Sequence, residues 1–331
     1  MLARLMQDWY QTKLTWRTRI LLPWSWLFAC VVFVRCKLYQ WRFLKSHQLS
    51  VPVIVVGNIV VGGTGKTPFV IWLAAFLKNQ GLRPGIVSKG VGGKRHLKPH
   101  LVTANDHAHE IGDEAVLLFH RTQCPMVIAT NRVEAAKVLL AKSQCNIVIS
   151  DDGLQHYRLH RDFEIVMVDG DRLHGNERFL PSGPLREPVR RITQAQLVIH
   201  HGGVYQPYSM HLAIDSLYSL TNQQQTMSLN EWHGQAVHAV AAIGHPQRFF
   251  NQLQLAGVTT ITHAFADHYM YQANDFKFND QLPIVMTEKD AVKCHEIADQ
   301  RFWCLKVDAM VSTPVQQAIK NWLTRSEYVS C

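Results

Sequence analysis

No CxxC pair and no histidine–cysteine spacing typical of a zinc site occurs in this sequence of 331 residues, although it contains seven cysteines and 18 histidines. The cysteines are scattered and do not form the even framework of a small secreted protein, so we expect a reducing cytosol. No segment has the polar, aromatic-poor composition of a disordered tail, and 47% of the residues are hydrophobic. These absences disfavour the disulfide-rich, zinc-dependent and disordered classes of protein.

Acidic residues are few, since 25 Asp and Glu stand against 34 Lys and Arg, which gives a formal net charge of +9. The excess indicates anionic partners, which include nucleic acid, phosphorylated small molecules and acidic lipid surfaces. A nucleic-acid-binding NTPase is disfavoured because no RNA- or DNA-binding motif occurs and the basic residues gather near the N-terminus. The length of the chain predicts two domains rather than one.

Long apolar runs are also scarce, and the one membrane signal is the uncharged stretch ILLPWSWLFACVVFV at 20–34. As a helix it would reach about 22 Å, short of a hydrocarbon core of about 30 Å, so we expect insertion into one leaflet rather than a span. Trp24 and Trp26 suit the headgroup layer. Basic residues that favour anionic lipid flank the run: Arg4, Lys13, Arg17, Arg19, Arg35, Lys37, Arg42 and Lys45. A buried N-terminal helix of a soluble domain is the alternative.

From residue 51 onward, short β-branched runs alternate with helical stretches, which is typical of a parallel α/β sheet. We expect strands at 53–56, 85–88, 126–129, 146–150, 164–169 and 196–200, with helices at 66–80, 114–121 and 132–142. A second, smaller α/β unit is expected to have strands at 236–243, 259–264, 283–287 and 302–307, with helices at 246–255, 290–297 and 313–324. The predicted domains are a membrane-associated helical segment (1–50), a core domain (51–210), a linker (211–235) and a C-terminal domain (236–331).

A glycine-rich stretch, GNIVVGGTGKTP at 57–68, lies directly between a predicted strand and a predicted helix. This context is typical of a phosphate-binding P-loop, in which curled backbone N–H groups face phosphate oxygens, a lysine reaches the β- and γ-phosphates and a threonine hydroxyl ligates Mg²⁺. The nucleotide-binding residues predicted here are Gly62, Gly63, Thr64, Gly65, Lys66 and Thr67. The fold class predicted is therefore a P-loop NTPase-like parallel sheet flanked by helices. The loop does not match GxxxxGK[ST] strictly, because Val60 stands at the first glycine, and an ordinary Gly-rich turn is the alternative.

Two adjacent acids, Asp151 and Asp152, follow the apolar strand predicted at 146–150. An acid at the end of a parallel strand beside a phosphate loop can hold Mg²⁺ directly or through water. Adjacent acids at a strand end also occur in ordinary turns, so their role depends on the neighbouring loop.

Seven motifs, in order along nearly the whole chain, resemble those of the tetraacyldisaccharide 4′-kinase family, the lipid A 4′-kinases of Gram-negative bacteria. The motifs are GNIVVGGTGKTP (57–68), IGDEA (111–115), DDGLQH (151–156), GPLRE (183–187), AAIGHPQRFF (241–250), FADHYMY (265–271) and TEKDAVK (287–293). The resemblance implies transfer of the ATP γ-phosphate to the 4′-hydroxyl of a tetraacyl glucosamine disaccharide 1-phosphate, forming lipid IVA at the cytoplasmic face of the inner membrane. It also implies two α/β domains joined by a β-ribbon, with ATP between them; no obligate protein partner is inferred.

The resemblance also implies roles for individual residues. Asp113 and His268 would form an acid–base pair that takes the proton of the sugar hydroxyl, while Lys66 and Mg²⁺ supply charge neutralisation. Arg186 would face phosphate. The metal and its waters would be managed by Thr67, Asp151, Asp152, Gln155 and Glu187.

Each of these roles has a plainer alternative when the residues are considered alone. Asp113 would serve equally well as a helix cap, and His268 as an interface residue. Arg186 and Glu187 would make a surface ion pair. Lys289 and Asp290 are typical of a helix start, and only the resemblance connects them with a nucleotide.

One loop departs from the family, because SKGVGG stands at 88–93 where an SRGYGG-like run is expected. Lys89 keeps the positive charge but lacks the planar fork of arginine, and Val91 offers no aromatic face on which a sugar could stack. We therefore expect acceptor affinity or preference to differ.

The main rival class is a membrane-attached regulatory ATPase of the ParA/MinD kind, which also combines a GGTGKT-like loop with a membrane segment. Those proteins carry a signature lysine immediately before the first glycine of this loop, and Val61 occupies that position. The kinase interpretation is therefore preferred.

Overall fold

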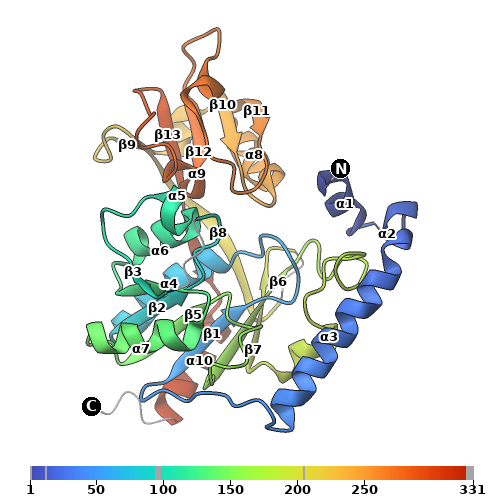
Figure 1. Cartoon of the computed structure of the whole chain (residues 1–331). Helices are drawn as coiled ribbons and strands as arrows, with labels where there is room; N and C mark the ends of the chain where they lie inside the picture. Colours follow the sequence, from blue (N-terminus) through green and yellow to red (C-terminus); the bar gives the residue numbers. More distant parts are fainter. Residues whose placement is uncertain (1, 12, 94–97, 204–205, 326–331) are drawn as a thin grey trace.

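The computed structural model describes residues 2–11, 13–93, 98–203 and 206–325. Figure 1 shows a central α/β body, a smaller unit above it and a helical N-terminal segment along one side. The last residues of the predicted C-terminal domain, 326–331, lie outside the described residues.

Within the described residues, thirteen strands form one continuous sheet in the order β11-β10-β12-β13-β8-β7-β6-β1-β5-β2-β4-β3, with β9 paired to β8. The strands are β1 (Val53–Gly57), β2 (Pro84–Ser88), β3 (His100–Leu101), β4 (Met126–Ile128), β5 (Ile147–Asp151), β6 (Phe163–Asp169), β7 (Leu197–His201), β8 (Ser209–Ser219), β9 (Thr226–Met227), β10 (Ala236–Ala241), β11 (Thr259–Ala264), β12 (Ile284–Thr287) and β13 (Phe302–Val311). Every strand expected from the sequence is present, within a few residues of its predicted ends.

The helices lie between these strands in the alternation that the sequence predicts. They are α1 (Leu2–Asp8), α2 (Trp16–Ile20), α3 (Leu22–Gln40), α4 (Lys66–Asn79), α5 (Ala108–Ile111), α6 (Asp113–Thr122), α7 (Arg132–Lys142), α8 (Pro246–Leu255), α9 (Glu288–Ala291) and α10 (Thr313–Arg325). Short 3-10 helices cover Val189–Gln194, Leu229–Trp232 and Ala273–Phe276.

Helices cover both faces of the sheet in the central body. β1 runs parallel to β5 and β6, and its side chains alternate between two cores. Ile54 and Val56 face the core that includes α4, whereas Val53 and Val55 face the core that includes α7. A parallel strand buried on both faces reads as an unbroken apolar run, which is why β1 was recognisable in the sequence. The predicted parallel sheet flanked by helices is confirmed.

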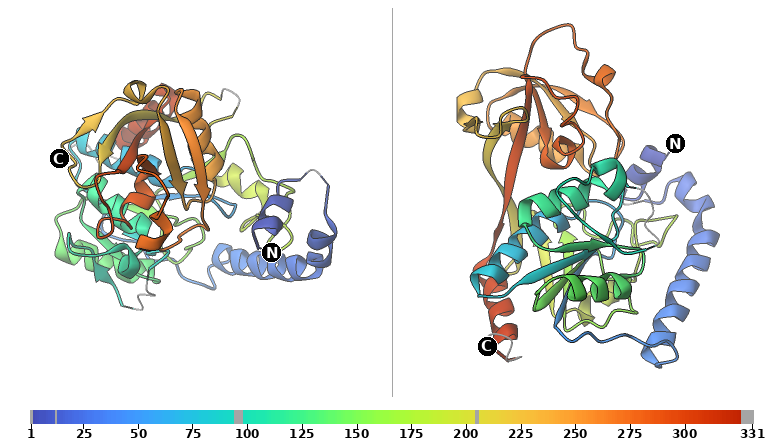
Figure 2. Two further views of the ribbon diagram at one scale, coloured as in Figure 1. Left: turned by 90° about the horizontal axis from the view of Figure 1, so that it is seen from above. Right: turned by 60° about the vertical axis from the view of Figure 1, so that its left-hand side comes forward.

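The upper unit repeats this layout on a smaller scale. β10, β11 and β12 pair in parallel, and α8 packs Phe250 and Leu253 against Val237 on one face. Tyr271 and Phe276 cover the other face. The predicted second α/β unit is therefore present, and Figure 2 shows from two further directions how it stands above the body.

An antiparallel ribbon of β8 and β13 connects the two units, with Met210 opposite Val311 at one end and Ser219 opposite Trp303 at the other. The predicted linker at 211–235 therefore begins as a strand of the sheet. This ribbon is the connection that the family resemblance implies, and β13 continues beyond the predicted end at 307.

The structure corrects the placement of the last helix, which the sequence assigned to the C-terminal domain. α10 buries Val315, Ile319 and Leu323 in the same core as β1. The rings of Trp322 and Phe163 lie 4.8 Å apart. Because β13 runs back along the ribbon, it delivers α10 to the base of the central body (Figure 1). The boundaries of the predicted domains remain a prediction, but this helix packs with the first unit.

A second correction concerns the helix predicted at 290–297. α9 ends at Ala291, and the following residues form tight turns in which Lys293 N donates to Asp290 O and Cys294 N to Ala291 O. These bonds span three residues rather than four, so the α-helix does not continue.

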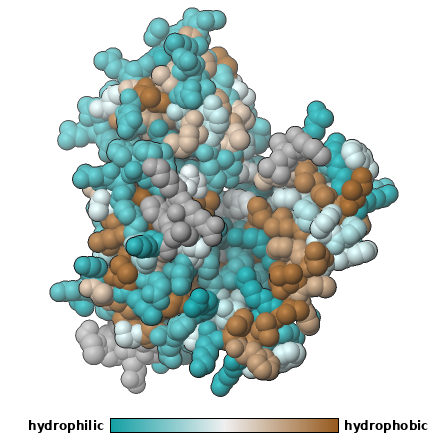
Figure 3. Space-filling model, in the orientation of Figure 1, coloured by the Kyte–Doolittle hydropathy of each residue, from teal (hydrophilic) through white to brown (hydrophobic). Residues whose placement is uncertain are grey.

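The N-terminal apolar run forms part of a longer helix than the sequence predicted. α3 continues past the uncharged residues to Gln40 and packs one side against the body. Ser25 Oγ donates to Phe179 O at 2.5 Å, and the rings of Tyr39 and Tyr157 lie 5.5 Å apart. The other side is exposed, and Figure 3 shows hydrophobic residues gathered along it.

We expect Ile319→Ala to lower the free energy of unfolding by about 2–4 kcal/mol, because it removes a fully buried side chain from the core shared by α10 and β1. The neighbouring Lys320→Ala, at an exposed position, should change it by less than about 0.5 kcal/mol. Urea unfolding followed by circular dichroism measures both. Equal stabilities for the two variants would show that α10 does not belong to this core.

Candidate active site

The glycine-rich loop connects the end of β1 to the first residue of α4, as predicted. Gly65 has φ +83°, and a Cβ added there would lie 2.5 Å from His201 Nδ1, so glycine is required. Asn58 Nδ2 donates to Thr64 Oγ1 at 3.1 Å, which holds the loop in its curl. The loop therefore presents Lys66 and Thr67 on the first turn of a helix.

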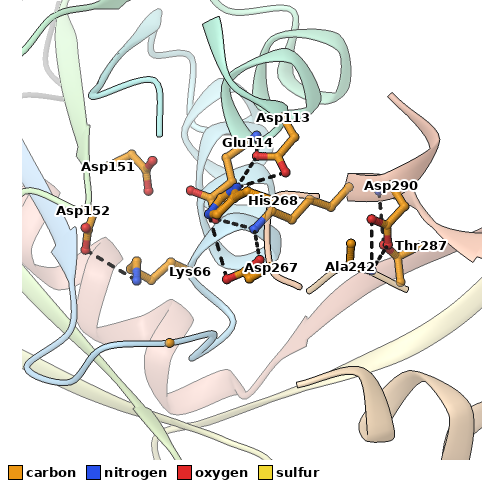
Figure 4. Close-up of polar contacts among 12 residues, drawn as sticks. Lys66, Asp113, Glu114, Asp151, Asp152, Ala242, Asp267, His268, Thr287 and Asp290 are labelled. Atoms are coloured by element: carbon orange, nitrogen blue, oxygen red, sulfur yellow. Dashed lines mark hydrogen bonds and ion pairs between the residues drawn. The ribbon is translucent and has the colours of Figure 1, made fainter. Parts of the chain in front are cut away.

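Lys66 and Arg186 both approach Asp152 at the end of β5. Lys66 Nζ lies 3.4 Å from Asp152 Oδ1, and Arg186 donates to both carboxylate oxygens at 2.8 and 3.0 Å. Burial acts to raise the pKa of Asp152, but the two cations outweigh it and hold this pKa well below the usual range. The structure thus brings together three residues that the sequence placed at the nucleotide, and Figure 4 shows Lys66 beside both acids.

Asp151 has a different electrostatic environment although it is the next residue along the chain. Its carboxylate is buried and accepts a hydrogen bond from Ser88 Oγ at 2.9 Å. Burial, reinforced by the charges of Glu114 and Asp152, raises the pKa of Asp151 to about 6. Lys66 offsets only part of this effect, so the carboxylate stays short of positive charge, a condition that a bound cation would relieve.

Two other predicted metal residues lie elsewhere. Gln155 Nε2 donates to Asn58 O at 3.1 Å, so its amide supports the backbone that leads into the loop. Glu187 accepts from Tyr157 OH at 3.0 Å and lines a separate cavity of about 320 Å³ beneath α3. Burial raises the pKa of Glu187. The described residues contain no cluster of three or more His, Cys, Asp or Glu side chains that could hold a metal, and the metal roles of Gln155 and Glu187 stay predictions.

The predicted acid–base pair comes together across the two units. Asp113 is the first residue of α6, and His268 lies in the loop after β11, 155 positions later. His268 Nδ1 lies 2.9 and 3.1 Å from the two oxygens of Asp113, which also accepts from Glu114 N at 2.8 Å. Asp113 is therefore not the helix cap, a position that Gly112 holds.

The contact shifts the protonation of both partners. The hydrogen bond to Asp113 is the main cause that raises the pKa of His268 above its ordinary value. Burial alone would raise the pKa of Asp113, but His268, Lys289 and Lys293 together lower it. The contact therefore stabilises the protonated imidazole and the ionised carboxylate relative to the isolated groups.

Lys66, Asp152, Arg186 and His268 line one cavity of about 390 Å³, which is bounded by the phosphate loop on one side and by the upper unit on the other. His268 lines it, whereas Asp113 is only 2% exposed and lies behind the imidazole. Val91, from the loop that departs from the family, also lines the cavity. A Cβ on the next residue, Gly92, would lie 2.9 Å from His268 Nδ1, so this loop packs directly on the pair.

Sequence reasoning missed a network that links the upper unit to the phosphate loop. Arg172 Nη2 donates to Gly63 O at 2.9 Å, and its Nε donates to Asp169 at 2.9 Å. Arg248 of α8 reaches the same carboxylate at 3.2 Å. The signals available were an acid at the end of β6 and the arginine of the GHPQR run, but their meeting depends on the fold.

Lys289 was left with only a helix-start role by the sequence, yet it lines the cavity. Its Nζ lies 3.1 Å from Glu114 Oε1 and 3.2 Å from Asp267 Oδ1. Burial would lower the pKa of Lys289, but Glu114, Asp113 and Asp267 raise it, so the side chain stays charged. It adds a further cation to the cavity, besides Lys66, Arg186 and Arg248.

A P-loop on a parallel sheet, with an Asp–His pair facing it across the cavity, defines a P-loop phosphotransferase. Comparison with known proteins makes this specific. The chain belongs to the tetraacyldisaccharide-1-P 4′-kinase family, whose sequence model matches residues 17–325.

Relatives and a solved structure agree with this assignment. The chain is 48% identical to a tetraacyldisaccharide 4′-kinase of Methylobacillus flagellatus over 309 residues, which cover 92% of each chain. It is 46% identical to one from Coxiella burnetii, with 96% of each covered. Its fold is similar to a crystal structure of LpxK from Aquifex aeolicus, described as an "apo" form in complex with ATP, with a TM-score of 0.78, 28% identity and coverage of 92% of this chain and 99% of that one.

The two adjacent acids should respond oppositely to neutralisation at pH 7.5. The folded pKa of Asp151, about 6, lies above its unfolded value, so this group lowers stability as pH rises through 4 to 6. Asp151→Asn should therefore raise the free energy of unfolding of the metal-free protein at pH 7.5 by about 1–2 kcal/mol, with little effect at pH 4.

Asp152→Asn is the matched control. The pKa of Asp152 is lower in the folded protein than in the unfolded chain, so the ionised carboxylate stabilises the fold above its unfolded pKa. Removal of this carboxylate should therefore lower the free energy of unfolding at pH 7.5. Urea titrations in the presence of a chelator measure both variants. Changes of the same sign at pH 7.5 would contradict this assignment of charges.

Proposed function

We propose that this protein transfers the γ-phosphate of ATP to the 4′-hydroxyl of a tetraacyl glucosamine disaccharide 1-phosphate, forming lipid IVA. The single observation that carries the proposal is the Asp113–His268 pair, which faces the phosphate loop across one cavity. Membership of the family supports the same acceptor. In the reaction the sugar O4′ forms a bond to the γ-phosphorus, the bond to the β,γ-bridging oxygen breaks, and ADP leaves.

The phosphate loop and its cations carry the charge of the transferring group. Backbone N–H groups of the loop and the N-terminus of α4 face the polyphosphate, and Lys66 neutralises the β- and γ-phosphates. Asp151, Asp152 and Thr67 are the residues that would hold Mg²⁺, and the raised pKa of Asp151, whose charge Lys66 only partly offsets, fits that use. The bound ion supplies further neutralisation of charge on the phosphate oxygens.

The acid–base pair takes the proton that the sugar hydroxyl loses. Since His268 lines the cavity and Asp113 lies behind it, the imidazole meets the acceptor while the carboxylate holds its Nδ1 side. The pair as a whole gains one proton. In the loop at 88–93, Lys89 cannot make a bidentate phosphate contact and Val91 offers no aromatic face on which a sugar could stack.

Membrane association follows from α3. In the described part of the chain, this is the one helix long and apolar enough to cross a membrane by length and composition, and its 19 residues reach about 28 Å. Contacts with the body run along it, at Ser25 with Phe179 and at Tyr39 with Tyr157. A helix that spanned the bilayer could not keep these contacts with a body that lies in water. We therefore infer that α3 lies in the cytoplasmic leaflet with its apolar side facing the lipid.

The kinase activity is tested with purified protein, Mg²⁺–ATP and detergent-dispersed disaccharide 1-phosphate. The mass of the lipid should increase by one phosphate. Asp113→Asn and His268→Gln should each lower turnover about 10²–10⁴-fold, because each removes proton transfer, while ATP binding measured by calorimetry persists. Asp299→Asn and His109→Gln, at exposed positions outside the cavity, should match the wild type. Loss of ATP without phosphorylation of the lipid would favour a regulatory ATPase instead.

The membrane contact is tested by charge rather than by truncation, because Met6 of α1 lines the cavity and deletion would damage the site. The triple variant Leu27→Glu, Val31→Glu and Val34→Glu changes three exposed side chains of α3. It should no longer float with anionic phospholipid vesicles, yet should still bind ATP. Leu255→Glu, at an exposed apolar position on α8, should leave flotation unchanged. Undiminished flotation of the triple variant would place the membrane contact elsewhere.

A further inference from the structure

Charged groups of the upper unit set the environment of Asp113, although it belongs to the central body. Lys293 Nζ, in the turn after α9, lies 3.8 Å from Asp113 Oδ2. No part of the Lys293 side chain is exposed. His268 contacts the same carboxylate, and Lys289 adds a third positive group to its surroundings. The carboxylate therefore gains these neighbours only where the two units meet.

Lys293 is fixed in place by a second acid, Asp290. Its Nζ lies 2.7 Å from Asp290 Oδ1 and 4.9 Å from the ring centroid of Tyr271. Asp290 in turn accepts hydrogen bonds from Thr287 Oγ1 at 2.7 Å, from Tyr271 OH at 3.1 Å and from Ala242 N at 3.1 and 3.2 Å. Figure 4 shows Thr287 and Ala242 converging on Asp290.

These hydrogen bonds determine how much of the negative charge of Asp290 is left for Lys293 to balance. Asp290 has three donors besides Lys293, so much of its negative charge is satisfied without the ammonium. A buried ammonium acts strongly on a carboxylate only a few ångströms away, since little water screens the pair. Asp290 therefore offsets only part of the positive charge of Lys293, and that charge also acts on the carboxylate of Asp113.

We propose that Lys293 is a positioning residue that keeps the Asp113–His268 pair in its proton-accepting form. The inference rests on the proposed function, in which this pair receives the proton of the acceptor hydroxyl. The groups that face the pair are Lys293 and Lys289 from α9 and the turn after it, Asp267 beside His268, and Glu114 on α6. Among these, Lys293 is the cation that is fully buried and does not line the cavity.

The direction of the effect follows from charge. A nearby ammonium disfavours an added proton, so it lowers the pKa at which the pair becomes protonated. Lys293 is one of the charges that lower the pKa of Asp113, and His268 shares the same proton. Without the ammonium, the pair should hold its proton to higher pH and be less able to accept another.

A purely structural role for Lys293 makes a different prediction. If its only task were to neutralise Asp290, its loss would lower stability and affect turnover equally at every pH. The pH at which the pair titrates would then stay in place.

The experiment compares Lys293→Met with the double variant Asp290→Asn/Lys293→Met, which removes both buried charges and avoids an unpaired carboxylate. The titration of the His268 imidazole is followed by NMR on histidine-labelled protein without lipid, with His268→Gln used to assign the signal. The imidazole pKa should rise by about one unit in Lys293→Met and by less in the double variant, because loss of the Asp290 charge acts in the opposite direction. The acid limb of the kcat–pH profile should move upward with it, while KM for ATP stays close to the wild-type value.

Lys320→Met, at an exposed position on α10, is the matched control and should leave both quantities unchanged. A double variant that melts cooperatively but keeps the wild-type imidazole titration would overturn the proposal. Failure of the proposed function is distinguishable, because the wild type would then not phosphorylate the lipid whatever the imidazole titration shows.

Discussion

The antiparallel pairing of β8 with β13 is the constraint on which the rest of the structure depends. Through it the two units share one sheet, and the phosphate loop at the end of β1 faces loops that follow β10 and β11. Asp113 and His268 lie on opposite sides of this junction, yet come within 2.9 Å. Because neither unit contains both residues, the Asp113–His268 contact forms only when the units are held together.

Electrostatics then assigns different tasks to carboxylates that look alike in the sequence. Asp152 lies between Lys66 and Arg186, which hold its pKa low, whereas for Asp151 burial outweighs the charge of Lys66 and raises the pKa to about 6. Adjacent acids with separated pKa values suit a site that must hold a cation and also keep a fixed negative charge near the lysine. A similar division occurs on the other side of the cavity, where Asp290 forms an ion pair with Lys293 and the charge of Lys293 also acts on Asp113.

The sequence could predict structure that depends on neighbouring residues, but few of the contacts between residues far apart in the chain. The strand–loop–helix unit around Lys66 was recognisable because glycine spacing and apolar periodicity act over a few residues. The seven motifs pointed to Asp113 and His268, but only the fold shows that the imidazole stands in front of the carboxylate. The return of α10 to the central body and the field of Lys293 on Asp113 could not be predicted, because both depend on the path of β13 and the turn after α9.

The N-terminal segment connects the membrane question to the chemistry. It is more than an anchor, because Trp9 Nε1 donates to Pro181 O at 3.0 Å and the ring of Tyr10 lies 4.9 Å from the guanidinium of Arg172, which holds the phosphate loop at Gly63. If α3 lies in the leaflet as proposed, its contacts with the body at Ser25 and Tyr39 would set the height of the cavity above the lipid. A lipid acceptor needs such a fixed height, since its sugar hydroxyl must reach the nucleotide while its acyl chains stay in the bilayer. In this proposal, the apolar face of α3 and the geometry of the phosphate loop act together to position the acceptor against the nucleotide.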